Sequence, residues 1–263
     1  MVIKMNVLIT GAASGIGFKT GIDMANLGYH VYLTTENEKQ LEVLKEKING
    51  QINVECFKLD VTNKKDGEKV KNLDIDIFIS NSAVGLGGSI LEADMNKVRE
   101  CYEVNVFSNF ELTKIILNNM LNKDSGKIII MSSMISNISL PFFGIYASTK
   151  ASISMLTNCL RKEIKMLTDN VKIVLIEPGI YKTGFNKVMI DNKIDSNTSL
   201  FLPYKKDILD DENLLLGIIG RKKLDSISKK IIKAVEDKYP KKIYRAPFFQ
   251  NLFIKFYIKY LKK

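Results

Sequence analysis

Short runs of Val, Ile and Leu recur along the chain and are separated by longer amphipathic stretches. The apolar runs predict strands over residues 6–10, 30–34, 53–57, 76–80, 127–131, 172–176 and 242–246. The intervening stretches predict helices over residues 16–27, 38–48, 63–71, 94–122 and 147–167. Strands that are apolar throughout are typical of a parallel sheet buried on both faces. We therefore predict an α/β chain with a three-layer, doubly wound Rossmann fold and a mainly parallel sheet of about seven strands.

The composition supports one folded unit. No linker-like, repetitive or low-complexity segment interrupts the 263 residues, and 46% of them are hydrophobic. We expect residues 1–263 to form a single domain, with a variable segment at 184–220 and a basic amphipathic tail at 247–263. The three cysteines are widely spaced and form no CxxC pair, which argues against disulfides and a metal site. With no signal peptide at the amino terminus, we expect a cytoplasmic protein.

The net charge of +10 is unevenly distributed along the chain. Residues 221–263 contain 14 Lys or Arg and 3 Asp or Glu, whereas residues 1–220 carry a net charge of −1. Because the positive charge is confined to one end and no recognition motif accompanies it, we expect no nucleic acid partner.

A glycine-rich turn, TGAASGIG, follows the first predicted strand and opens the first predicted helix. Gly11, Gly15 and Gly17 allow a tight turn and a close approach of the backbone to a pyrophosphate, which the helix amino terminus attracts. A glycine triplet can also be only a turn. Its place after the first strand of an alternating pattern predicts a dinucleotide site, in which Ser14 and Ile16 also take part.

The ends of the next two strands supply candidate nucleotide contacts. Glu36 can accept hydrogen bonds from the ribose hydroxyls, and the Arg or Lys that a 2′-phosphate prefers is missing here, so NAD is favoured over NADP. Asp60 and Val61 follow the third strand and suit the adenine edge. Each carboxylate has a simpler interpretation, since Glu36 or Asp60 could instead cap the helix that follows it.

Four polar residues are candidates for chemistry at the carboxyl edge of the sheet. Tyr146 and Lys150 lie four residues apart on a predicted helix and so share one face. An ammonium about 4 Å from a phenol would stabilise the phenolate by roughly 4 kcal/mol and lower the tyrosine pKa by up to about 3 units. Ser133 ends the fifth strand and can hold a carbonyl oxygen while the phenol moves a proton. Asn105 is a polar break in an apolar helix, where it could kink the backbone or hold a water.

These motifs resemble those of the short-chain dehydrogenase/reductase family. TGAASGIG is similar to its TGxxxGxG turn, YASTK to its YxxxK motif and EPGIYKT (177–183) to its PGxxxT segment. The resemblance implies that Tyr146 is the proton donor or acceptor, Lys150 shifts its pKa and anchors the ribose, Ser133 holds the carbonyl, and Asn105 supports a proton-relay water. It also implies a further set of residues beside the nicotinamide, namely Pro178, Gly179, Tyr181 and Thr183.

One segment departs from the family pattern. Where the family has NNAG after the fourth strand, this chain has Ser80, Asn81, Ser82 and Ala83. The last three are candidate cofactor contacts, and the loss of the first Asn removes a sheet-bracing amide, so we expect an altered affinity for the cofactor. The chain resembles the branch of the family that acts on steroids, retinoids and other lipophilic alcohols or carbonyls.

The variable segment 184–220 is the predicted substrate lid. It supplies apolar side chains that would contact a lipophilic substrate or simply pack the lid onto the domain, namely Phe185, Val188, Met189, Ile190, Leu200, Phe201 and Leu202. We expect an NAD(P)-dependent oxidoreductase for a secondary alcohol or carbonyl. The alternatives are a dinucleotide sensor without catalysis and, less in keeping with the glycine spacing, a sugar-nucleotide epimerase.

The terminal residues NLFIKFYIKYLKK form the basic part of the tail. Thirteen helical residues rise only about 20 Å, which is too short for a hydrocarbon core of about 30 Å. The tail could lie on an anionic membrane surface, pack against the lid, or contact a second subunit. We expect the chain to form a homodimer or homotetramer.

Overall fold

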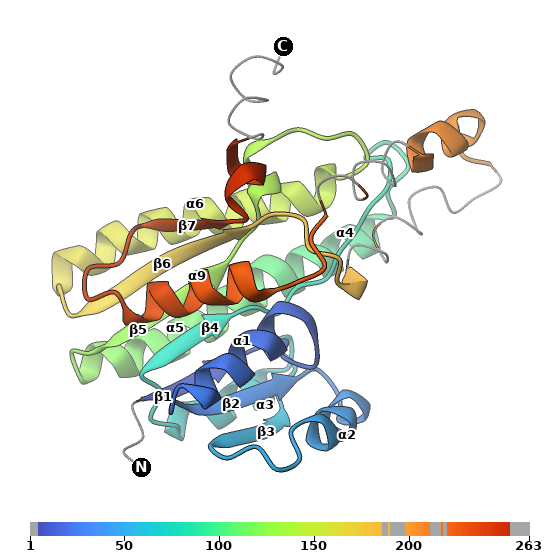
Figure 1. The fold of residues 1–263 in the computed structure, drawn as a ribbon. Helices are drawn as coiled ribbons and strands as arrows, with labels where there is room; N and C mark the ends of the chain where they lie inside the picture. The colour runs from blue at the N-terminus through green and yellow to red at the C-terminus, as the bar shows by residue number, and fades with distance from the viewer. Residues whose placement is uncertain (1–4, 186–188, 190–197, 211–216, 218–219, 253–263) are drawn as a thin grey trace.

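A parallel sheet of seven strands lies at the centre of the computed structural model, which describes residues 5–185, 189, 198–210, 217 and 220–252 (Figure 1). The strands are β1 (Asn6–Ile9), β2 (His30–Thr35), β3 (Val54–Lys58), β4 (Ile77–Ser80), β5 (Gly126–Met131), β6 (Val171–Pro178) and β7 (Ile243–Ala246). They are arranged in the order β3-β2-β1-β4-β5-β6-β7, and all neighbours are parallel. The predicted doubly wound fold is confirmed.

Helices cover both faces of this sheet (Figure 1). One face packs against α1 (Gly15–Asn26), α2 (Glu38–Lys47) and α9 (Asp225–Glu236). The other packs against α5 (Asn109–Asn122) and α6 (Gly144–Leu167), with α4 (Met95–Tyr102) beside α6 and the short α3 (Lys64–Lys69) leading into the 3₁₀ turn η1 (Val70–Asn72). Further 3₁₀ turns are η3 (Met134–Asn137) and η4 (Leu202–Tyr204).

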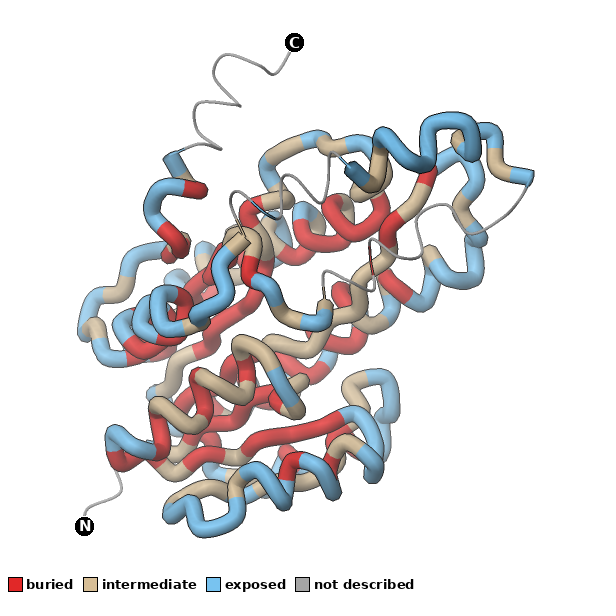
Figure 2. The backbone as a smooth tube through the Cα atoms, turned by 45° about the vertical axis from the view of Figure 1, so that its right-hand side comes forward, coloured by how far each residue is buried: buried red, intermediate tan, exposed pale blue. Residues whose placement is uncertain are grey.

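The alternation of side chains along each strand explains why the strands are apolar throughout. In β1, Val7 and Ile9 belong to the core beneath α1 and α9, whereas Leu8 belongs to the core beneath α5 and α6. Successive side chains of a strand point to opposite faces, so a strand covered on both sides needs an apolar residue at every position. Figure 2 shows the resulting band of buried backbone through the middle of the molecule.

Two elements differ from the sequence prediction. The single helix predicted over 94–122 is divided into α4 and α5 by a π-helical turn, η2 (Glu103–Ser108), which contains Asn105. Helix α9 was not predicted, although residues 225–236 alternate lysines with apolar side chains at helical spacing. The spacing of Ile227, Ile231 and Ile232 between those lysines is the amphipathic signal that could have identified it.

The topology determines where a ligand can bind. β1 pairs with both β2 and β4, so the strand order reverses between β1 and β4. Ligands of open α/β sheets bind at such a switch point, outside the carboxyl ends of the strands. The loops that follow β1, β4, β5 and β6 meet at this edge, and they contain the candidate residues.

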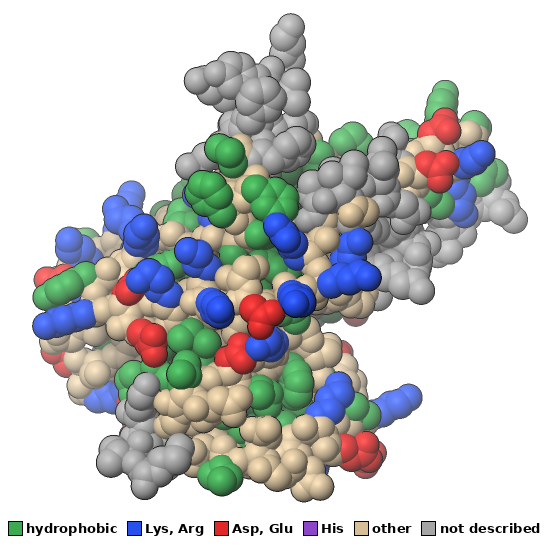
Figure 3. Space-filling view, in the orientation of Figure 1, with side chains coloured by type: hydrophobic (Ala, Val, Ile, Leu, Met, Phe, Trp, Pro, Cys, Tyr) green, Lys and Arg blue, Asp and Glu red, His purple; other side chains and the backbone are tan. Residues whose placement is uncertain are grey.

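The surface around α9 is strongly basic (Figure 3). We define the basic face by its exposed cationic residues, which are Arg221, Lys222, Lys223, Lys229, Lys230, Lys233, Lys238, Lys241 and Lys242. Exposed Phe248 and Leu252 follow it in the chain. In the described part of the chain, no helix is long and apolar enough to cross a bilayer.

Candidate active site

A cavity of about 980 Å³ opens at the carboxyl edge of the sheet. Its wall brings together nearly all of the candidate residues, namely Gly11, Ser14, Gly15, Ile16, Glu36, Asp60, Val61, Asn81, Ser82, Ala83, Ser133, Tyr146, Lys150, Pro178, Gly179, Tyr181 and Thr183. Two candidates, Gly17 and Asn105, do not line the cavity and lie behind its wall.

The glycine turn after β1 has the shape that a pyrophosphate requires. Gly11 and Gly15 have φ values of +62° and +63°, which favour glycine. A Cβ at Gly17 would lie 2.7 Å from the Asn81 amide nitrogen, whereas a Cβ at Gly15 would meet nothing nearer than Thr183, at 3.6 Å. The Thr183 side chain therefore lies within van der Waals reach of the glycine turn. Ser14 makes no side-chain capping bond at the start of α1, so the first-turn N–H groups can bind an anion.

The two candidate ribose and adenine contacts do not act as helix caps. Asn37 caps α2 by accepting from the Gln40 N–H at 3.0 Å, and Asn63 caps α3. Glu36 is exposed on the cavity wall, where it accepts a bond from Gln40 Nε2. Asp60 also lines the cavity and accepts two bonds from Thr62. The capping interpretations of Glu36 and Asp60 are wrong.

The loop after β4 is braced by residues that the sequence analysis did not identify. Thr10 Oγ1 accepts from the backbone N–H groups of Asn81 and Ser82, at 3.0 and 3.1 Å. Asn109 accepts from the Ser80 hydroxyl at 2.9 Å and donates to the Ser82 carbonyl at 2.9 Å. The Asn109 amide thus braces this loop where the family's first Asn is missing. A polar Asn at the start of an apolar helix was the available signal.

Asn105 holds the same loop from behind. Its Oδ1 accepts from Val84 N at 2.8 Å, and its Nδ2 donates to Val84 O at 2.9 Å and to Thr149 Oγ1 at 3.1 Å. The side chain is only 1% exposed. The predicted backbone distortion is present as the π turn η2. The geometry makes Asn105 a positioning residue for the cavity wall.

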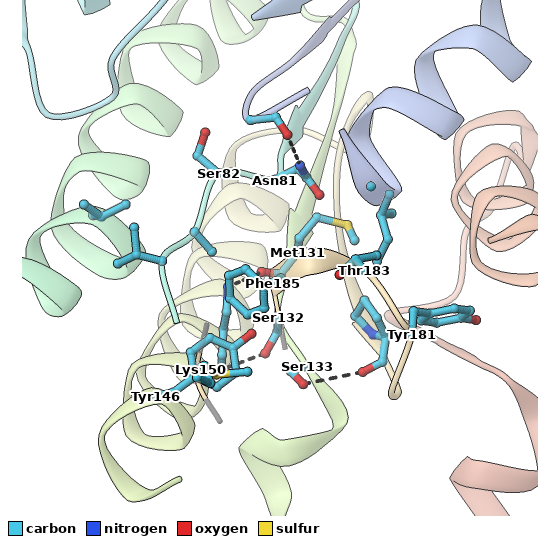
Figure 4. A pocket seen from close by; sticks show the side chains of 18 of the residues that line it. Asn81, Ser82, Met131, Ser132, Ser133, Tyr146, Lys150, Tyr181, Thr183 and Phe185 are labelled. Atoms are coloured by element: carbon cyan, nitrogen blue, oxygen red, sulfur yellow. Dashed lines mark hydrogen bonds between the residues drawn. The ribbon is translucent and has the colours of Figure 1, made fainter. Parts of the chain in front are cut away.

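Tyr146 and Lys150 both face the cavity from α6, as the spacing predicts (Figure 4). Lys150 Nζ lies 5.7 Å from the centre of the Tyr146 ring and donates to the Met131 carbonyl at 3.1 Å. Burial lowers the pKa of Lys150 to about 8. Burial also raises the pKa of Tyr146, so the expected lowering by the ammonium is wrong for this arrangement. The cost of removing the phenolate from water is the larger effect.

Ser133 lies on the same side of the cavity as Tyr146 and Lys150 (Figure 4). Its hydroxyl caps η3 by accepting from Ile135 N at 3.3 Å, and it makes a long bond of 3.5 Å to the Pro178 carbonyl. The neighbouring Ser132 Oγ donates to the Lys150 carbonyl at 3.0 Å, which ties the end of β5 to α6. The hydroxyl of Ser133 is thus weakly held and can turn to a ligand oxygen.

The loop after β6 forms the opposite wall. Thr183 approaches the glycine turn at Gly15, and Pro178 and Gly179 also line the cavity. The Tyr181 ring points away from Tyr146, and its hydroxyl bonds to Ser226 at 2.7 Å (Figure 4). A contact of Tyr181 with a nicotinamide would therefore come from its backbone.

The remainder of the wall is mostly apolar. It is formed by Val84, Val104, Met134, Ile135, Ile138, Leu140, Phe143, Phe185 and Met189. The Phe185 ring lies 5.5 Å from that of Tyr146, so the first residues of the predicted lid do contact the site. Leu200, Phe201 and Leu202 do not line the cavity, whereas Val188 and Ile190 lie outside the described residues.

Comparisons with known proteins agree with this geometry. A family model described as short chain dehydrogenase matches residues 5–193. The chain is 29% identical over 191 residues to the probable short-chain type dehydrogenase/reductase VdlC of Helicobacter pylori, covering 70% of this chain and 68% of that protein. It is 31% identical over 189 residues to estradiol 17-beta-dehydrogenase 11 of Macaca fascicularis, covering 69% of this chain and 63% of that protein.

Solved structures share the fold. A short chain dehydrogenase/reductase from Burkholderia phymatum in complex with NAD has a TM-score of 0.82 at 18% identity, covering 99% of this chain and 96% of that one. The closed form of a serine dehydrogenase complexed with NADP⁺ has a TM-score of 0.77 at 22% identity, covering 94% of this chain and 96% of that one.

Proposed function

Because this chain belongs to the short-chain dehydrogenase/reductase family, the NAD(P)-dependent oxidoreductases of alcohols and carbonyls, we propose that it interconverts a lipophilic secondary alcohol and its ketone, with Tyr146 as general acid and base. The observation that carries this proposal is the convergence of Tyr146, Lys150 and Ser133 on a mainly apolar cavity that the glycine turn also lines. That residues 1–263 form one domain stays a prediction.

The cavity fits a nicotinamide dinucleotide. The first turn of α1 would hold the pyrophosphate, Glu36 and Asp60 would lie beside the adenosine, and Thr183 would lie beside the nicotinamide. When bound, the nicotinamide supplies or accepts the hydride. Lys150, which Met131 orients, would anchor the nicotinamide ribose.

Side chains of this protein would transfer the proton to and from the substrate oxygen. Ser133 would hold the substrate oxygen by turning its hydroxyl away from the Pro178 carbonyl, to which it is bound at 3.5 Å. Tyr146 would donate a proton to that oxygen in reduction and remove it in oxidation. Burial lowers the pKa of Lys150 and raises that of Tyr146, so the ammonium would be the stronger acid of the two and would return a proton to the tyrosine.

The charges of the cavity wall favour NAD and a neutral substrate. Among its described residues, Glu36, Asp60, Glu100 and Glu103 are acidic, and Lys150 is the one cation. Lys47 lies near the glycine turn but donates to the Ala13 carbonyl and is not part of the wall. A 2′-phosphate or a substrate carboxylate would therefore meet repulsion and little pairing.

We also propose two larger binding partners, an anionic membrane surface and a second copy of this chain. The basic face and the exposed Phe248 and Leu252 suit an anionic membrane surface, with the tail as the contact; residues 253–263 of this tail lie outside the described residues. Exposed apolar side chains on α6, Met155, Met166 and Leu167, suit a symmetric contact with a second copy. A monomer in sedimentation velocity at micromolar concentration would contradict this second partner.

The decisive experiment follows absorbance at 340 nm with NADH and NADPH against a panel of neutral ketones and alcohols of increasing size. Tyr146→Phe should bind NADH as the wild type does and lose turnover by about 10²- to 10⁴-fold, because the general acid and base is removed. Undiminished turnover would refute the role of Tyr146. Tight NADH binding with no turnover on any member of the panel would favour the alternative, a dinucleotide sensor.

A further inference from the structure

A glutamine from the carboxyl-terminal segment is buried against the loop after β6. Gln250 follows strand β7, which begins seven residues earlier at Ile243, and it is only 2% exposed. Its Oε1 accepts from Ile180 N at 2.7 Å, and its Nε2 donates to Ile180 O at 3.2 Å. One side chain thus binds both backbone groups of a single residue, 70 positions away in the sequence.

Ile180 lies at the centre of the loop that forms the nicotinamide side of the cavity. Its carbonyl also accepts from Arg221 N at 3.0 Å, and the Arg221 carbonyl accepts from Lys182 N at 2.7 Å. The loop is therefore held by backbone pairing on one side and by Gln250 on the other. Gln250 itself lines the cavity together with Pro178 and Gly179.

The contact is shaped around this glutamine. A Cβ at Gly179 would lie 1.9 Å from Gln250 Oε1, so the amide can approach the loop only because residue 179 is glycine. The Arg221 guanidinium lies 4.5 Å from the centre of the Phe249 ring, which holds the neighbouring residue against the same loop. A buried amide is costly unless its hydrogen bonds are made, so apolar packing alone would be served better by Leu or Met.

We propose that Gln250 is a positioning residue that clamps the backbone of Ile180 and thereby sets the geometry of the Pro178–Thr183 wall against the nicotinamide. The expected effect of this clamp on catalysis rests on the proposed function. It makes the carboxyl-terminal segment a part of the active site, although that segment follows the last strand and lies beyond the family motifs.

The test uses Gln250→Met in the full-length protein, because Met preserves the volume of Gln and removes both hydrogen bonds. In the cofactor-free protein, hydrogen exchange of the Ile180 amide should become at least tenfold faster, since its acceptor is lost. NADH binding, followed by the fluorescence of the bound nucleotide, should weaken about five- to tenfold, and kcat/KM should fall in parallel. Asn251→Ala, at the half-buried neighbouring position, should change none of these measurements by more than twofold.

A second pair of variants keeps the proposal falsifiable if Gln250→Met does not fold. Gly179→Ala should strongly weaken NADH binding in the wild-type background, where the added methyl would overlap Gln250 Oε1. In the Gln250→Ala background the same change should be less harmful, because the overlapping atom is absent. Additive effects of the two substitutions would overturn the clamp.

Hydrogen exchange, NADH affinity and turnover together distinguish a failure of the clamp from a failure of the proposed function. Unchanged Ile180 exchange and unchanged NADH affinity in Gln250→Met would overturn the clamp, whatever the turnover. Faster exchange with unchanged NADH affinity would also overturn it, because Gln250 would then serve local structure only. Faster exchange and weaker NADH binding, in a protein that turns over no substrate, would support the clamp and refute the proposed function.

Discussion

Replacement of Lys150 by Met should stabilise the protein while removing its activity. Lys150 is 3% exposed, and among the described residues its ammonium donates one hydrogen bond, to the Met131 carbonyl, with the Tyr146 ring 5.7 Å away. Burial lowers its pKa from 10.5 to about 8. At about 1.36 kcal/mol per unit, this corresponds to roughly 3 kcal/mol of stability lost at pH 7. Buried ionic groups replaced by apolar ones of similar volume often give gains of about 1–4 kcal/mol.

The pH dependence identifies the cause. Between pH 8 and 10.5 the unfolded chain binds more protons at Lys150 than the folded chain does, so this group makes stability rise with pH across that window. The advantage of Lys150→Met should therefore be largest below pH 8 and shrink toward pH 10.5. Cys101 and Tyr146 face the same site, but burial raises both of their pKa values, and both remain in the variant. Lys150 partly offsets the raised pKa of the Cys101 thiol, so its removal raises that pKa further and makes the advantage of the variant shrink faster above about pH 9.

Urea unfolding of the cofactor-free protein at pH 7.0 and 9.5 measures this effect. Lys230→Met, which replaces an exposed lysine on α9, is the matched control and should leave stability within about 0.5 kcal/mol. A variant less stable than the wild type at pH 7, or a gain that does not depend on pH, would refute the reasoning that an uncompensated charge is buried at this site.

The remaining predictions concern the cofactor and the membrane. Glu36→Arg should raise the ratio of kcat/KM for NADPH to that for NADH by at least tenfold, because a guanidinium replaces a carboxylate on the adenosine side of the cavity; an unchanged ratio would mean that Glu36 does not contact the ribose. The full chain should co-sediment with vesicles that contain anionic lipid and not with neutral vesicles. Deletion of residues 251–263 should abolish the binding to the anionic vesicles. If the truncated chain binds anionic vesicles as well as the full chain does, the basic face and not the tail is the membrane contact.

The limits of the sequence prediction are visible at particular residues. The spacing of Tyr146 and Lys150 predicted that both would share a face of α6, and they do. It could not predict how deeply that face is buried, and the burial reverses the expected shift in the pKa of Tyr146. Likewise, the polar break at Asn105 was visible in the sequence, but its bonds to Val84, a residue 21 positions earlier, depend on tertiary packing.

The sequence by itself determined the sheet, the glycine turn and the motif residues that surround the cavity, because periodicity, turn chemistry and helical spacing are local properties of the chain. Only the tertiary structure decided which groups are desolvated and which distant partners satisfy them. Asn109 braces Ser80 and Ser82, and Gln250 reaches Ile180 across 70 residues, through contacts that no local pattern specifies. The electrostatics of the site depend on burial, and burial is a property of the whole fold.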